Sequence, residues 1–173
     1  MAEFCFIPIL VAIGANLPGP DGRSAIDTCR CAAARMDAWP GFRLIGLSRW
    51  FETEPIPPSG QPPYVNGVAL LQGTPDVIAD PAAILGVLLS IETGLGRVRS
   101  VPNAARSVDL DLIAIGDTVR QSPDPILPHP RAHLRAFVLA PLADVAPGWV
   151  HPVLNRRASE MLAGLPRQGF RPL

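Results

Sequence analysis

Apolar positions recur along the chain in two different periods, and each change of period marks a new element. Residues 6–14 form a continuous apolar run, which predicts a buried strand that ends in a turn rich in Gly, Asn and Pro over residues 14–20. Apolar residues then recur at helical spacing between residues 26 and 36, until Pro40 and Gly41 interrupt the pattern. The first third of the chain therefore predicts a strand followed by a helix.

Two further strands are predicted in the middle of the chain. The first covers about residues 42–51, and a segment with five prolines, residues 54–63, follows it. This segment is too long for a tight hairpin, so we expect a mobile surface loop. Residues 64–72 alternate between polar and apolar in a way that predicts a third strand. The side chains that this alternation places on one face are Tyr64, Asn66, Val68 and Leu70.

A second helix and a fourth strand complete a recognisable order. Asp80 and Pro81 form a good N-cap and first helical position for a helix that ends near residue 95. A loop over residues 97–107 leads to a strand that starts at Asp109. The order strand, helix, strand, strand, helix, strand predicts an α+β fold, a ferredoxin-like split β-α-β sheet with helices on one face. A C-terminal extension with a short helix from about Asn155 would follow, in a single domain over residues 1–173.

Composition limits the class of protein. The 173 residues are 48% hydrophobic, and 15 basic residues balance 15 acidic ones, so no net charge favours nucleic acid or an anionic membrane. No stretch approaches the roughly 18 apolar residues that a membrane span needs. The three cysteines show neither a zinc spacing nor an even number for a disulfide framework. We therefore expect a cytoplasmic monomer with small-molecule substrates and without a nucleic-acid or membrane partner.

The most informative motif is the pair Asp109 and Asp111 at the start of the last predicted strand. Alternate side chains of a strand share a face, so the two carboxylates point the same way, with backbones ~7 Å apart. Such a pair can bracket two magnesium ions about 3.5 to 4 Å apart, the geometry of phosphoryl transfer. Arg97, Arg99 and Arg106 lie shortly before it and suit triphosphate charge. The alternative is a charged strand edge with surface ion pairs.

Other residues suit the binding of a flat heterocycle or a phosphate. Tyr64 and Asn66 offer an aromatic ring and a two-way amide from one face of the sheet. Phe137 could be an opposing ring or an ordinary core residue, and the sequence leaves both open, as it does for Tyr64. His129 lies between two prolines and could donate a hydrogen bond to a phosphate oxygen.

Taken together in this order, the motifs resemble the 6-hydroxymethyl-7,8-dihydropterin pyrophosphokinase family of folate biosynthesis, over most of the chain. The similar segments are Ala12–Leu17, Ser48–Pro55, Gln61–Asn66, Ile91–Arg97, Arg106–Asp111, Leu127–Pro130 and Arg135–Leu139. The resemblance implies transfer of pyrophosphate from ATP, the co-substrate, to the hydroxymethyl group of the pterin, with two Mg²⁺ ions and release of AMP.

The resemblance also implies roles for individual residues. Asp109 and Asp111 would hold both metal ions and, with Arg97, Arg99 and Arg106, would form the catalytic set. The residues that would contact the pterin are Thr53, Glu54, Ile56, Tyr64, Asn66 and Phe137. Those that would contact ATP are Glu92, Arg97, Arg99, Arg106, Leu112, His129 and Arg135.

The chain departs from the family pattern at a few positions. The loop 100–105 lacks the Gly-Pro pair usual before the arginine, Ala15 stands where Ser is common, and Pro130 stands where some members have an aromatic residue. None of these changes removes a metal ligand or a pterin contact, so an active enzyme is expected. Two alternatives remain: a non-catalytic ferredoxin-like module that binds nucleotide or pterin, and a kinase that moves only the γ-phosphate.

Overall fold

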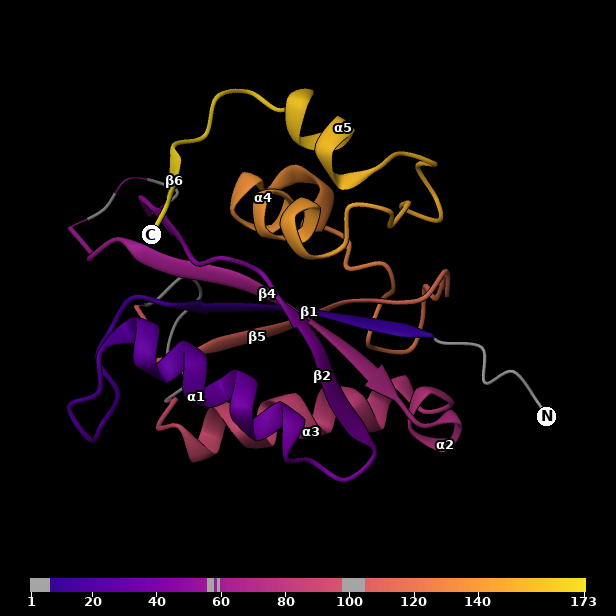
Figure 1. Cartoon of the computed structure of the whole chain (residues 1–173), viewed down its shortest axis with the longest axis horizontal. Helices are drawn as coiled ribbons and strands as arrows, with labels where there is room; N and C mark the ends of the chain where they lie inside the picture. The colour runs from indigo at the N-terminus through magenta and orange to yellow at the C-terminus, as the bar shows by residue number, and fades with distance from the viewer. Residues whose placement is uncertain (1–6, 56–57, 59, 98–104) are drawn as a thin grey trace.

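The computed structural model describes residues 7–55, 58, 60–97 and 105–173, which form a layered structure around one antiparallel sheet (Figure 1). Strand β1 (Pro8–Ala15) lies between β4 (Tyr64–Gly73) and β5 (Asp109–Ile115) and is antiparallel to both. Strands β2 (Phe42–Leu47) and β3 (Phe51–Thr53) both pair with β4, and β6 (Phe170–Pro172) pairs with β3. The central order β5-β1-β4-β2 is that of the predicted ferredoxin-like sheet, which confirms the fold class.

Helices cover both faces of the sheet, whereas the sequence predicted helices on one face only. Helix α1 (Ala25–Asp37), α3 (Pro81–Gly94) and the short α2 (Pro75–Ile78) lie on one side. Helix α4 (Ala136–Val145) and α5 (Ala158–Ala163), preceded by a 3-10 turn at Ala132–Leu134, pack on the other side (Figure 1). The C-terminal extension therefore supplies a second layer rather than a peripheral appendage.

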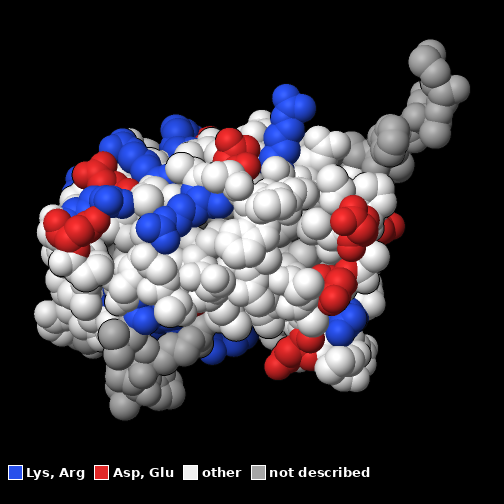
Figure 2. Space-filling model, turned by 90° about the horizontal axis from the view of Figure 1, so that it is seen from below, with Lys and Arg blue, Asp and Glu red and all other residues white. Residues whose placement is uncertain are grey.

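Each face of the sheet buries its own apolar cluster. The α1–α3 side contains Ile13, Leu88, Leu110 and Leu112, whereas the α4 side contains Val68. Leu70 also packs on the α4 side, so the predicted alternation of β4 is confirmed. Seen from the α1–α3 side, charged side chains of both signs surround an uncharged centre (Figure 2). No helix in the described part of the chain is long and apolar enough to cross a membrane.

The predicted strand over residues 42–51 is interrupted, and Ser48 explains the break. Its buried hydroxyl accepts the N–H of Val68 at 2.9 Å and donates to the carbonyl of Arg49 at 2.7 Å. A side chain thus takes a β4 amide that a strand backbone would otherwise bond, so β2 ends at Leu47 and β3 begins at Phe51.

Helix α4 was not predicted as a helix, although the apolar run that forms it was noted. Pro141 lies inside it and has no N–H to donate to the preceding turn. Burial of Val138, Leu139 and Leu142 against the sheet offsets this loss. The short elements α2 and β6 were also unpredicted, because segments of three or four residues carry no measurable period.

Burial on the α1–α3 side predicts a clear contrast between two neighbouring leucines of α3. Leu88 is fully buried, whereas Leu89 is 36% exposed. Replacement Leu88→Ala should lower the free energy of unfolding by about 2–5 kcal/mol, because it leaves a cavity under the sheet. The control Leu89→Ala should change it by about 1 kcal/mol or less. Urea unfolding measures both, and equal losses would contradict this description of the core.

Candidate functional site

The two predicted metal ligands lie on the α4 side of the sheet, at the start of β5. Strand register places Asp109 beside Gly14 of β1, and Gly14 beside Asn66 of β4. Asp111 lies two residues further along β5, beside Ala12. Asn66 and Asp109 therefore stand in one row, two strand spacings or about 10 Å apart. The small Gly14 lies between them, and a Cβ atom built on it would come within 3.2 Å of Asn66 Oδ1.

Arginines occupy both oxygens of Asp109. Arg97 contacts Oδ1, and Arg106 donates to Oδ2 at 2.6 Å. Arg97 also donates to Oε1 of Glu92 at 2.5 Å. Glu92 is only 2% exposed, and the same oxygen accepts the N–H of Leu110 at 2.7 Å. Glu92, which was predicted as a nucleotide contact, anchors Arg97 and the backbone of β5 in the structure.

The negative charge of Asp111 is less well compensated by nearby cations than that of Asp109. The Arg135 guanidinium lies beside it, with Nη1 3.8 Å from Oδ2. Burial, and then the charge of Asp109, raise the pKa of Asp111 above the usual aspartate value of 3.8. Two carboxylates on one face thus repel each other, which is the local condition that a bound cation relieves.

The donor set suits Mg²⁺. This ion uses one or two carboxylates and completes its octahedron with water and substrate phosphates. Within the described ranges, no group of three or more His, Cys, Asp or Glu gathers that could enclose a metal by itself. A carboxylate pair with open positions for phosphate oxygens therefore fits Mg²⁺ better than it fits a closed structural metal site.

His129 lies beside this pair as a neutral hydrogen-bond donor. Its backbone N–H donates to the carbonyl of Ile113 at 2.8 Å, which fixes the segment around His129 against β5. Its Nδ1 accepts the N–H of Arg131 at 3.2 Å, which leaves the ring proton on Nε2. Burial lowers the pKa of His129 below 6.5, although Asp111 acts in the opposite direction. A neutral Nε2–H can donate to an anionic oxygen without adding charge.

The predicted heterocycle contacts also meet on this side. Asn66 is buried and donates from Nδ2 to Oγ1 of Thr53 at 2.8 Å. Tyr64 lies two residues earlier on the same face, and its hydroxyl donates to Gln61 at 3.2 Å. Phe137 is half-buried in the first turn of α4, with the Arg135 guanidinium 5.4 Å above its ring. Both aromatic rings thus lie on the side of the sheet that α4 covers.

The remaining predicted residues differ in where they lie. The side chain of Leu112 is buried in the cluster under α1 and α3, on the face opposite Asp111. Glu54 is exposed at the end of β3. Ile56 and Arg99 lie outside the described residues. Asn16 and Gln61, which were not among the predicted site residues, join two loops of the site through a hydrogen bond. The position of Asn16 directly after a buried strand was the only sign of this in the sequence.

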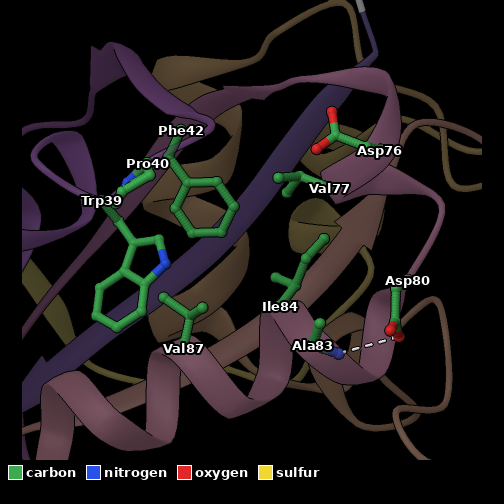
Figure 3. Close-up of a pocket in the computed structure, with 9 residues that line it drawn as sticks. All are labelled: Trp39, Pro40, Phe42, Asp76, Val77, Asp80, Ala83, Ile84 and Val87. Atoms are coloured by element: carbon green, nitrogen blue, oxygen red, sulfur yellow. Dashed lines mark hydrogen bonds between the residues drawn. The ribbon is translucent and has the colours of Figure 1, made fainter.

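A separate cleft of about 270 Å³ opens on the α1–α3 side (Figure 3). Trp39, Phe42, Ile84 and Val87 form its apolar wall, and Asp76 lies at its upper rim in this view. None of the residues predicted for catalysis or substrate binding lines it. The sheet separates it from Asp109 and Asp111, so it forms no part of the candidate site.

Comparison with known proteins gives the same assignment as the motifs. The family model for 7,8-dihydro-6-hydroxymethylpterin-pyrophosphokinase (HPPK) matches residues 10–147. The chain belongs to this family. A 2-amino-4-hydroxy-6-hydroxymethyldihydropteridine pyrophosphokinase of Pseudomonas aeruginosa is 37% identical over 165 residues, which cover 95% of this chain and 96% of the relative. One of Synechocystis sp. is 36% identical, over 83% of this chain and 68% of the relative.

Solved structures support the fold independently. Wild-type HPPK-DHPS of Plasmodium falciparum superposes with a TM-score of 0.68 at 14% identity, over 94% of this chain and 45% of that chain. The match confirms the fold, and the sequence relatives above carry the functional comparison.

The charge balance at the carboxylate pair generates a stability prediction. Because the pKa of Asp111 is higher in the folded than in the unfolded protein, the folded protein binds this proton more tightly. Protonated Asp111 therefore stabilises the fold at acid pH, and this stabilisation is lost as the pH rises through the folded-state pKa. Replacement Asp111→Asn should therefore raise the melting temperature at pH 7 without metal, and this gain should shrink toward pH 3.

A second aspartate provides a control of opposite sign. Hydrogen bonds from Arg49 lower the pKa of Asp144, so its ionised form stabilises the fold above the unfolded pKa and this contribution is lost as the pH falls. Asp144→Asn should slightly lower the melting temperature at pH 7. Calorimetry in EDTA measures both variants. A lower melting temperature for Asp111→Asn would mean that attraction to Arg135 outweighs the repulsion.

Proposed function

We propose that this chain transfers the β,γ-pyrophosphoryl group of ATP to the hydroxymethyl oxygen of 6-hydroxymethyl-7,8-dihydropterin, which gives AMP and the pterin diphosphate in folate biosynthesis. Its family and the names of its relatives support this reaction. They also favour a catalytic role over the alternative of a non-catalytic binding module. The reaction requires ATP as co-substrate.

The observation that carries the proposal is the row formed by Asn66, Gly14 and Asp109 across three strands. It sets an amide that can read a heterocycle edge about 10 Å from a carboxylate that can hold a metal. A two-ring heterocycle with a short hydroxymethyl arm spans such a distance. The pterin would thus lie over Gly14, with its reactive oxygen toward the aspartates.

At the pterin end, each group has a defined task. The Asn66 amide, oriented by Thr53, would bond the edge of the heterocycle, and Tyr64 and Phe137 would stack on its two faces. Glu54 is exposed directly after Thr53, and Glu54 and Ile56 stay predicted contacts of the pterin. These contacts fix the direction of the hydroxymethyl arm, which is the main requirement for an in-line transfer.

At the phosphate end, Asp109 and Asp111 would hold two Mg²⁺ ions. When bound, these ions neutralise phosphoryl charge and make the attacking hydroxyl more acidic. Arg97 and Arg106, which now contact Asp109, would turn their remaining N–H groups to phosphate oxygens. Arg99, His129 and Arg135 would complete this shell. No side chain is assigned as general base.

The protein is proposed to work as a cytoplasmic monomer on small molecules alone. The balanced charge and the mixed signs on the α1–α3 face offer no basic surface there for nucleic acid.

Product analysis tests the reaction. With ATP, Mg²⁺ and the hydroxymethyl pterin, chromatography should show AMP and the pterin diphosphate in equal amounts. ADP instead of AMP would indicate transfer of the γ-phosphate alone, and absence of turnover would indicate a binding module. The variant Asp111→Asn should lose several orders of magnitude in turnover while it remains folded, because the ions lose a ligand. Near-normal turnover of this variant would refute the metal assignment.

The role of Asn66 predicts a selective binding defect. Asn66→Ala removes the amide that reads the heterocycle, so the pterin Kd should rise at least about tenfold, while the Kd for Mg–ATP analogue changes little. Calorimetry with each ligand separately makes the comparison within one variant. An equal loss for both ligands would show that Asn66 supports the fold of the site and does not contact the pterin.

A further inference from the structure

A glutamine from the C-terminal segment caps helix α4. Gln168 is half-buried between α5 and β6, and its amide contacts the two peptide groups on either side of Arg135. Its Oε1 accepts the N–H of Ala136 at 2.9 Å, and its Nε2 donates to the carbonyl of Leu134 at 3.1 Å. One planar side chain is thus hydrogen-bonded to both peptide groups that flank Arg135.

Helix α4 needs this cap because its own N-cap residue cannot supply one. Arg135 stands at the N-cap with an extended backbone, and its side chain makes no capping hydrogen bond. A guanidinium has donors only, so it cannot accept a hydrogen bond from the free N–H groups of a first helical turn. Gln168 lies 32 residues from Ala136 in the sequence and provides the acceptor that a serine or aspartate gives at an ordinary N-cap.

The two hydrogen bonds restrict the backbone from which Phe137 begins. Rotation about either backbone bond of Arg135 would turn one of the flanking peptide groups away from the Gln168 amide. Phe137 is the second residue of α4, so the direction of its ring follows from this backbone. The Arg135 guanidinium lies 5.4 Å over one face of the ring, and a heterocycle would stack on the other.

The same C-terminal segment also holds the strand at the opposite wall of the site. One residue after Gln168 the chain enters β6, which pairs with β3 and places Phe170 beside Thr53. The ring of Phe170 meets that of Phe51 edge-on, with centroids 6.0 Å apart. Figure 1 shows the segment running from α5 past α4 to β6. It therefore ties the start of α4 to the strand that carries Thr53.

We propose that Gln168 is a positioning residue that holds Phe137 for stacking on the pterin. This role rests on the proposed function, in which Phe137 and Tyr64 stack on the two faces of the heterocycle. Gln168 itself would not touch the pterin. It fixes the first turn of α4 relative to β3 before the pterin binds, so that the Phe137 ring has little freedom left to lose on binding.

A double-mutant cycle tests whether Gln168 acts through Phe137. Calorimetry measures the Kd of the hydroxymethyl pterin in the presence of Mg²⁺ and α,β-methylene-ATP, with the analogue kept saturating for each variant. Gln168→Ala should raise this Kd about five- to tenfold, and Phe137→Ala should raise it at least as much. The double variant should bind pterin no more weakly than Phe137→Ala, because a positioning residue has no effect once its target is absent.

A matched control separates positioning from the general loss of a helix cap. Glu160 caps α5 in the same layer, where its Oε2 accepts the N–H of Arg157 at 2.9 Å. Glu160→Ala and Gln168→Ala should each lower the melting temperature by about 2–4 °C. Only Gln168→Ala should weaken pterin binding, and Glu160→Ala should keep the wild-type Kd.

The outcomes distinguish this role from the proposed function. A wild-type pterin Kd in Gln168→Ala, or losses that add in the double variant, would show that Gln168 only stabilises the fold and would overturn the inference. Should Gln168→Ala fail to fold, Gln168→Glu keeps the acceptor for Ala136 and removes only the donor to Leu134. Its pterin Kd should rise about threefold or more, and an unchanged Kd would overturn the inference equally. An unchanged Kd in Phe137→Ala would instead refute the proposed placement of the pterin.

Discussion

The site depends on the balance of charge around two carboxylates that share one face of β5. Asp109 and Asp111 repel each other, and their charges are compensated unequally: two arginines contact Asp109 directly, whereas the Arg135 guanidinium lies 3.8 Å from Asp111. Burial, and then the charge of Asp109, raise the pKa of Asp111, and the nearby cations only partly oppose this. A cation that binds here gains from relieving the repulsion, and this gain offsets part of the cost of dehydrating the ion.

The sheet, rather than the loops, sets the distance between the two ends of the site. Asn66, Gly14 and Asp109 belong to three neighbouring strands whose spacing the backbone hydrogen bonds fix. Both ends thus stand on one rigid platform, which suits a transfer that depends mainly on alignment. The arginines reach the platform from connecting segments, where they can change partners without disturbing the strands.

The sequence predicted the features that depend on local periodicity. It did not predict those that depend on contacts between residues far apart in the chain. The strand alternation correctly placed Asp109 with Asp111 and Val68 with Leu70, because a period of two needs no tertiary information. Helix α4 was missed because Pro141 lowers helical propensity, and only packing on the sheet offsets it. The roles of Asn16 could not be predicted, because its partners lie 45 to 90 residues away.

Two single-residue predictions illustrate the same limit at the site. The resemblance to the family implied a nucleotide contact for Leu112, but the alternation of β5 turns its side chain into the core under α1 and α3. Glu92 was placed at the nucleotide by motif alone, and only the tertiary structure shows it 2% exposed under Arg97.

Glu92 also explains how Arg97 can change partners and stay in place. Arg97 is shared between Glu92, which is buried, and Asp109, which is half-exposed. If Asp109 turns toward a metal, Glu92 still holds the guanidinium at 2.5 Å and keeps it oriented. Because Glu92 also binds the N–H of Leu110, it ties α3, Arg97 and β5 into one unit. The arginine then meets phosphate from a fixed position, with little entropy left to lose.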